Sequence, residues 1–89
     1  MLSPVFVEFL GTSLLVGTVA FTGVPVLIVA ALAVAIGLGG KISGGHFNPA
    51  VTMWALASGK LSKAKAIGYI LAQILGGVFV WVMGSMLKV

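Results

Sequence analysis

The chain has 89 residues, which is enough for one small domain. Its residues are 61% hydrophobic and only 7% charged, and the mean hydropathy is +1.29. A soluble domain carries roughly 25% charged residues, and so small a chain has too much surface to hide this many apolar side chains from water. The composition argues against a soluble enzyme, a nucleic-acid-binding module and a disordered tail. It predicts a bundle of membrane helices surrounded by lipid.

Residues that carry charge or bind metals are scarce. Five lysines, no arginine and a single acidic residue, Glu8, give a net charge of +4. The few lysines form no basic stripe, so no nucleic-acid partner is expected. Cysteine is absent, and one histidine with one glutamate leaves almost no ligands for a metal ion and no members for a catalytic dyad. We therefore expect no cofactor, no metal ion and no enzymatic activity.

Two apolar segments open the chain and predict two helices. Residues from about 4 to 22 supply the ~20 residues that a membrane-spanning helix needs. A cleaved signal peptide is the alternative, but this segment has no basic residue at its start and contains Glu8. Gly23-Val24-Pro25 predicts a break, and the apolar run from about 25 to 38 predicts a second helix because proline suits the first helical turn.

A glycine-rich segment, Gly37 to His46, follows the second helix. Glycine costs about 1 kcal/mol in a helix interior, so the second helix is predicted to stop before these glycines. A short helix is predicted between Asn48-Pro49 and Ser58-Gly59, because asparagine caps helix starts, proline suits the first position and glycine follows helix ends. A last spanning helix is predicted over about 64–87.

The segment 41–58 has the pattern of a re-entrant loop followed by a half-length helix. Non-helical backbone is tolerated inside a membrane only where protein or a water-filled cavity surrounds it. In such a cavity the carbonyl groups of Gly44, Gly45 and His46 would face passing water or solute. The N-terminus of the half-helix would carry about half a positive charge, which repels cations. The alternative is an ordinary loop at the membrane surface with a short surface helix.

Three motifs together resemble one family of membrane proteins. The run from Ser43 to Thr52, Ser-Gly-Gly-His-Phe-Asn-Pro-Ala-Val-Thr, closely resembles the first Asn-Pro-Ala loop of the aquaporin and aquaglyceroporin family, the major intrinsic proteins. The segment 7–12 resembles the start of that family's first helix, and residues 69–77 are similar to its third helix. The resemblance covers essentially the whole chain. It implies an all-α membrane protein with three transmembrane helices plus a re-entrant half-helix, so that residues 1–89 form a single half of an inverted-repeat fold.

The resemblance also implies a passive channel for water or small neutral solutes such as glycerol. Asn48, followed by Pro49 and Ala50, would stand at the constriction and donate its side-chain amide to the passing solute. Counting back from Asn48 places Ile28 at a selectivity position where the family often has an aromatic residue. The filter arginine of the family's second half has no counterpart here, because Val51 holds that place and the chain lacks arginine.

Three polar residues are expected to support the loop. By the resemblance, Glu8 accepts hydrogen bonds from the loop backbone, and Gln73 braces the loop from the third helix. His46 is either a packed structural histidine or a residue that faces the pore. A different class of protein, the small proton-coupled multidrug antiporters, also uses one glutamate in its first helix, and Glu8 as a proton carrier is the alternative reading of the same residue.

The partners follow from the half-length fold. A complete pore would need a second aquaporin-like half, either an inverted copy or a separate chain, so we expect an oligomer in membrane lipid. The stripe of small residues Ala64, Gly68, Ala72 and Gly76 offers a close-packing surface for that pairing. An inactive first-half fragment is the alternative. With a cytoplasmic N-terminus, four lysines would lie inside and Lys88 outside, which the positive-inside rule favours.

Overall fold

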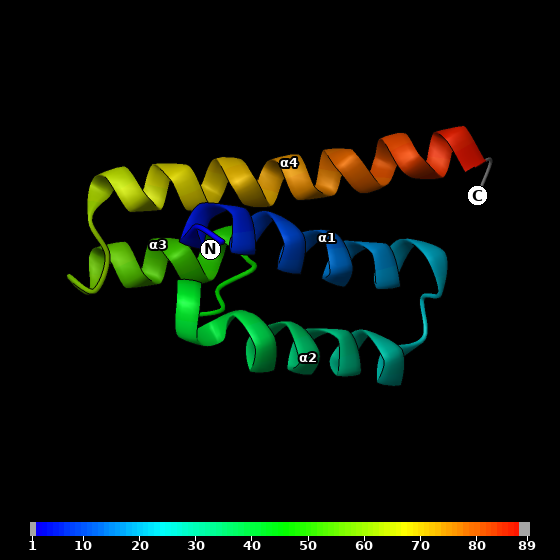
Figure 1. Ribbon diagram of the computed structural model, residues 1–89, viewed down its shortest axis with the longest axis horizontal. Coiled ribbons are helices and arrows are strands. Elements are labelled where there is room, and N and C mark those ends of the chain that lie inside the picture. The colour runs from blue at the N-terminus through cyan, green and yellow to red at the C-terminus, as the bar shows by residue number, and fades with distance from the viewer. Residues whose placement is uncertain (1, 88–89) are drawn as a thin grey trace.

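The computed structural model describes residues 2–87, and within that range every regular element is a helix (Figure 1). The helices are α1 (Pro4–Phe21), α2 (Pro25–Ser43), α3 (Pro49–Ala57) and α4 (Lys63–Leu87). Helices α1, α2 and α4 are long and apolar enough to cross a membrane. The predicted fold class, three transmembrane helices plus one short helix, is confirmed. Lys88, which was predicted to lie on the opposite side of the membrane, is outside the described residues.

The helix starts follow from local chemistry. Ser3 caps α1, since its hydroxyl accepts a hydrogen bond of 3.1 Å from the Phe6 amide, and Pro4 opens the helix. Proline also opens α2 and α3. The turn between α1 and α2 contains Gly23 at φ +63°, a backbone conformation that favours glycine.

The second helix differs from its predicted extent, because α2 continues through the glycines to Ser43 instead of ending near residue 38. Its buried residues recur every four positions, at Ala31, Ala35, Gly39 and Ser43, and the helix packs against α1. A Cβ atom on Gly39 would lie 2.6 Å from Cγ1 of Val7, so glycine is what permits this contact. Packing between the helices therefore outweighs the low helix propensity of glycine.

The helix stops only at Gly44, which adopts φ +92° and donates its amide to the Gly40 carbonyl. As a result, the non-helical part of the predicted re-entrant segment shrinks to residues 44–48. Residues 41–43 belong to α2.

Helix α1 lies at the centre of the arrangement, between α2 and α4, and α3 packs against α4 (Figure 1). In the described range, the backbones of α2 and α4 do not pack against each other, and a hydrogen bond from the Tyr69 hydroxyl to the Ser43 carbonyl joins the two helices. The small-residue stripe of α4 faces α1 within the same chain: a Cβ atom on Gly76 would lie 3.2 Å from the Phe9 carbonyl oxygen. This use of the stripe inside the chain differs from the predicted use in joining two halves.

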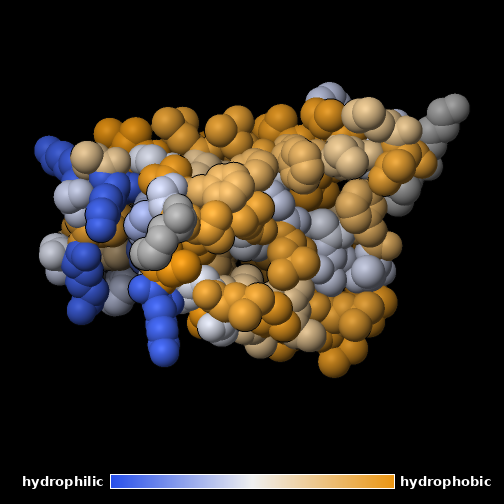
Figure 2. Space-filling model, in the orientation of Figure 1, coloured by the Kyte–Doolittle hydropathy of each residue, from blue (hydrophilic) through white to orange (hydrophobic). Residues whose placement is uncertain are grey.

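The outer surface matches a lipid environment. Large apolar side chains are widely exposed, among them Leu38 at 79% and Trp81 at 71%. Figure 2 shows these hydrophobic residues along most of the visible face, while the strongly hydrophilic residues gather at the end where α4 begins. That end carries Lys41, Lys60, Lys63 and Lys65.

Candidate functional site: a loop held inside the helix bundle

The centre of the site is Glu8, which is 0% exposed on α1. Its Oε2 accepts hydrogen bonds from the Ser43 hydroxyl at 2.7 Å and the His46 amide at 3.1 Å. Its Oε1 accepts from the Phe47 amide at 2.7 Å and from Nε2 of Gln73 at 2.9 Å. All four partners donate, so both carboxylate oxygens serve as acceptors and one side chain links α1, α2, the loop and α4.

Gln73 continues this network toward α3. Its Nε2 donates to Glu8 and also to the Thr52 hydroxyl, at 2.8 Å. The opposite orientation of the amide would turn its oxygen toward the carboxylate, so Glu8 fixes which way the Gln73 amide points. The Thr52 oxygen lies 2.9 Å from Nδ1 of His46, and since it already accepts from Gln73, its proton is available to that nitrogen.

Tyr69 holds the last turn of α2 and the ring of His46. It is 2% exposed, and its hydroxyl donates to the Ser43 carbonyl at 2.6 Å. The His46 ring meets the Tyr69 ring edge to face, with 5.2 Å between centroids. His46 is thus half-buried and held on both sides by packing and hydrogen bonding.

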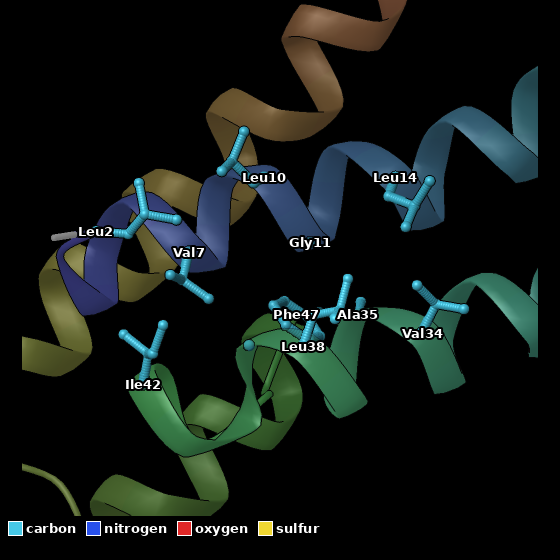
Figure 3. Close-up of a pocket in the computed structure, with 11 residues that line it drawn as sticks. Leu2, Val7, Leu10, Gly11, Leu14, Val34, Ala35, Leu38, Ile42 and Phe47 are labelled. Carbon is cyan, nitrogen blue, oxygen red and sulfur yellow. The ribbon is translucent and has the colours of Figure 1, made fainter.

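Phe47 anchors the loop by shape. Its ring is 2% exposed and lies between α1 and α2, facing Gly11 and Ala35 (Figure 3). A Cβ atom on Gly11 would collide with this ring. Phe47 has φ +52°, a conformation that costs a non-glycine residue about 1–3 kcal/mol and persists only where the surroundings hold it. Two contacts stabilise this conformation: the ring packs between α1 and α2, and the Phe47 amide donates to Glu8.

Two buried polar atoms in the described region have no hydrogen-bond partner, Oγ1 of Thr12 and Oε1 of Gln73. For Gln73 the reason is geometric, because both of its N–H groups are directed to Glu8 and Thr52. Thr12 lies on α1 with an exposed fraction of 4%.

Asn48 is exposed at the start of α3. Its Oδ1 accepts from the Ala50 amide at 2.8 Å, which caps the helix. With the oxygen engaged in the cap, the side-chain NH₂ is the group that remains to donate to a ligand. Pro49 and Ala50 are also exposed, as is Gly44, while Gly45 is half-buried.

The remaining predicted site residue lies elsewhere. Ile28 is half-buried near the start of α2, about 22 Å along the helix axis from Ser43 at a rise of about 1.5 Å per residue. The structure therefore brings Glu8, His46 and Gln73 together and leaves Ile28 outside their network. The loop is held against the helices, because Phe47 is buried and the amides of His46 and Phe47 bond to the Glu8 carboxylate on α1.

Four residues of the network were not singled out as site residues from the sequence: Ser43, Phe47, Thr52 and Tyr69. Ser43, Phe47 and Thr52 lie within the motif that carries the family resemblance, which was the available signal. Each of these four residues has a partner 21 to 39 residues away in the chain, and no local pattern indicates such a contact.

Comparison with known proteins gives the family. The family described as "Major intrinsic protein" matches residues 1–87, and the chain belongs to this family. It is accordingly an integral membrane protein of a channel family and not an enzyme. No solved structure matches the chain at a comparable level of significance.

Three curated relatives illustrate the match. Glycerol uptake facilitator protein-like 6 of Lactiplantibacillus plantarum is 44% identical over 84 residues, covering 80% of this chain and 37% of that protein. Aquaporin Z of Photorhabdus laumondii is 38% identical over 93 residues, covering 88% of this chain and 40% of that protein. Probable aquaporin TIP1-2 of Oryza sativa is 54% identical over 48 residues, or 54% of this chain and 19% of that protein. The chain thus spans well under half the length of these relatives.

Proposed function

We propose that this chain forms one half of a passive transmembrane pore for water or small neutral solutes such as glycerol. The observation that carries the proposal is the exposed Asn48 amide at the start of α3, on a loop that Glu8 holds inside the helix bundle. A loop at membrane depth requires surrounding protein or a water-filled cavity, and this loop has protein on one side and an exposed helix start on the other. The relatives named as aquaporins and as a glycerol facilitator support the same solute class.

The chemistry of such a pore follows from the helix start. The Asn48 NH₂ group would donate to a solute oxygen, and the carbonyl groups of Gly44, Gly45 and His46 would accept from solute hydroxyls. The N-terminus of α3 contributes about half a positive charge at the same place, which opposes the entry of cations. Ile28 is proposed as a selectivity residue nearer to one mouth.

The other wall of the pore would come from a second aquaporin-like half. The exposed residues of α3, Val51 at 39%, Met53 at 50% and Trp54 at 59%, leave the short helix partly uncovered. We propose that a second half covers this side, supplied by further polypeptide, by an inverted copy or by a separate chain. Inverted pairing of two halves is a common way to build a site at the membrane midplane.

The geometry favours this function over proton-coupled antiport. A proton carrier must exchange its proton with water on both sides of the membrane. Glu8 is 0% exposed and receives four hydrogen bonds, and these contacts suit a residue that braces the loop.

Swelling of proteoliposomes in water and glycerol gradients, followed by stopped-flow light scattering, tests the pore. Asn48→Asp is the informative variant, because aspartate also caps helices and should leave α3 folded. We expect lower solute flux and a new cation leak, since the carboxylate removes the NH₂ donor and offsets the helix field. Unchanged flux together with unchanged cation exclusion would contradict the role of Asn48.

Crosslinking tests the second half. Single cysteines replacing Ala50 in two copies should crosslink in native membranes if an inverted pair brings the two helix starts together. Full water flux from a chain shown to be monomeric in the bilayer would contradict the half-pore. Absence of both flux and crosslinks would favour a fragment that needs a different second half.

A further inference from the structure

One apolar groove lies between α1 and α2 and holds the Phe47 ring. A second apolar groove lies on the opposite side of α1. It runs between α1 and α4 and has a volume of about 360 Å³. Its apolar walls include Val5, Phe6, Phe9, Gly68, Leu71 and Leu75. The missing side chain at Gly68 keeps the groove open, because a Cβ atom there would lie 3.0 Å from Cγ2 of Val5.

The groove leads to the basic end of the molecule. Lys65 precedes Gly68 by three residues on α4, so the two share one face of the helix. Lys60 and Lys63 lie at the same end, and all three lysines are exposed. Figure 2 shows the strongly hydrophilic residues gathered at this end. The sole acidic residue of the chain is the buried Glu8, so no side-chain carboxylate is available on the surface to neutralise them.

The same end has the marks of a membrane–water interface. Nζ of Lys60 lies 5.8 Å from the centroid of the Trp54 ring, a cation–π contact, and Trp54 is 59% exposed. Tryptophan with flanking lysine is typical of the depth at which lipid head groups lie. An acyl chain in the groove would therefore have its head group beside Lys65.

From this juxtaposition we propose that the α1–α4 groove binds one acyl chain of an anionic phospholipid, whose phosphate pairs with Lys65. The apolar walls match the acyl chain, and the lysines without counter-charge select an anionic head group over a zwitterionic one. The groove between α1 and α2 is a poorer site for lipid, because the Phe47 ring enters it and Lys41 is the single lysine of α2. The proposal does not depend on pore activity.

The test uses a tryptophan reporter in the groove of the full chain. Leu75→Trp is introduced after Trp54→Phe and Trp81→Phe, and the protein is reconstituted in phosphatidylcholine vesicles. An equal small fraction of lipid with brominated acyl chains, either phosphatidylglycerol or phosphatidylcholine, is then added. We expect brominated phosphatidylglycerol to quench the reporter with about fivefold higher apparent affinity, because its head group has a net negative charge, whereas the choline of phosphatidylcholine neutralises its phosphate. This factor corresponds to the attraction of one surface lysine for a net negative head group.

Two charge variants make the test specific. Lys65→Gln should abolish the preference, whereas Lys41→Gln removes the same charge from the same end of the molecule and should keep it. Equal quenching by the two lipids would overturn the proposal, and so would an equal effect of both charge variants. Absence of quenching by either lipid would also overturn it, because another protein surface would then cover the groove.

Discussion

The two ends of α1 use polar side chains in opposite ways. Around Glu8, hydroxyl, amide and carboxylate groups bond across helices, to partners 21 to 65 residues away in the chain. Toward the other end, Thr18, Thr22 and Ser85 each donate to a carbonyl four residues earlier, at 2.6 to 3.0 Å. The first set ties four elements together, while the second set ties each hydroxyl to its own backbone.

This difference separates the region that holds the loop from a region whose polar side chains bond within their own helices. In lipid every polar group needs a partner, and a hydroxyl that bonds within its own helix places no demand on its neighbours. A hydroxyl that bonds to another helix fixes the position of that helix. The network around Glu8 therefore locates the loop and Asn48, and three pairs of substitutions test whether the contrast has the expected energetic consequences.

The largest effect is expected at Glu8. Glu8→Ala would leave the His46 and Phe47 amides and two side-chain donors without an acceptor, at about 1–3 kcal/mol for each buried donor. We expect almost no folded protein, measured as the monodisperse fraction in detergent. Glu8→Gln should give an intermediate result, because one acceptor oxygen remains and the new NH₂ faces donors. A wild-type yield of the alanine variant would contradict the bracing role.

A smaller effect is expected where the loop is held by shape. In Gly11→Ala the new methyl group would collide with the Phe47 ring, and overpacking of this kind costs about 1–3 kcal/mol. Gly37→Ala is the matched control, since nothing lies within 4 Å of its Cβ position, and should leave the unfolding temperature in detergent unchanged or raise it. Equal destabilisation by the two variants would mean that close packing of the Phe47 ring against Gly11 does not contribute to stability.

The smallest effect, and the most direct test of the contrast, compares two threonines. Thr52→Val removes the acceptor of Gln73 and the partner of His46, for an expected loss of about 1–2 kcal/mol in the free energy of unfolding. Thr18→Val removes a hydroxyl that bonds to its own helix and should change that free energy by less than about 0.5 kcal/mol. Reversible unfolding in mixed detergent measures both. If Thr18→Val proved the more damaging, the contrast between the two regions would fail.

Much of the architecture is encoded locally. Apolar runs of spanning length specify α1 and α4, and Asn48-Pro49 specifies the start of α3, because length, capping and proline geometry act within a few residues. Glu8 also stands out in the sequence, since a carboxylate inside an apolar helix is costly without a partner. The family resemblance, and not a local pattern, indicated the loop backbone as the partner of Glu8 and Gln73 as a second bracing residue.

Tertiary contacts determine where α2 ends and how the loop is held in place. Helix propensity alone places the end of α2 before its glycines, but contact between Gly39 and Val7 carries the helix on to Ser43. Phe47 keeps its positive φ because of a slot that α1 and α2 form together, and Thr52 acquires its role from a glutamine 21 residues later. Such contacts join residues that are distant in the chain, and the free energy that favours them exists only once the helices have packed.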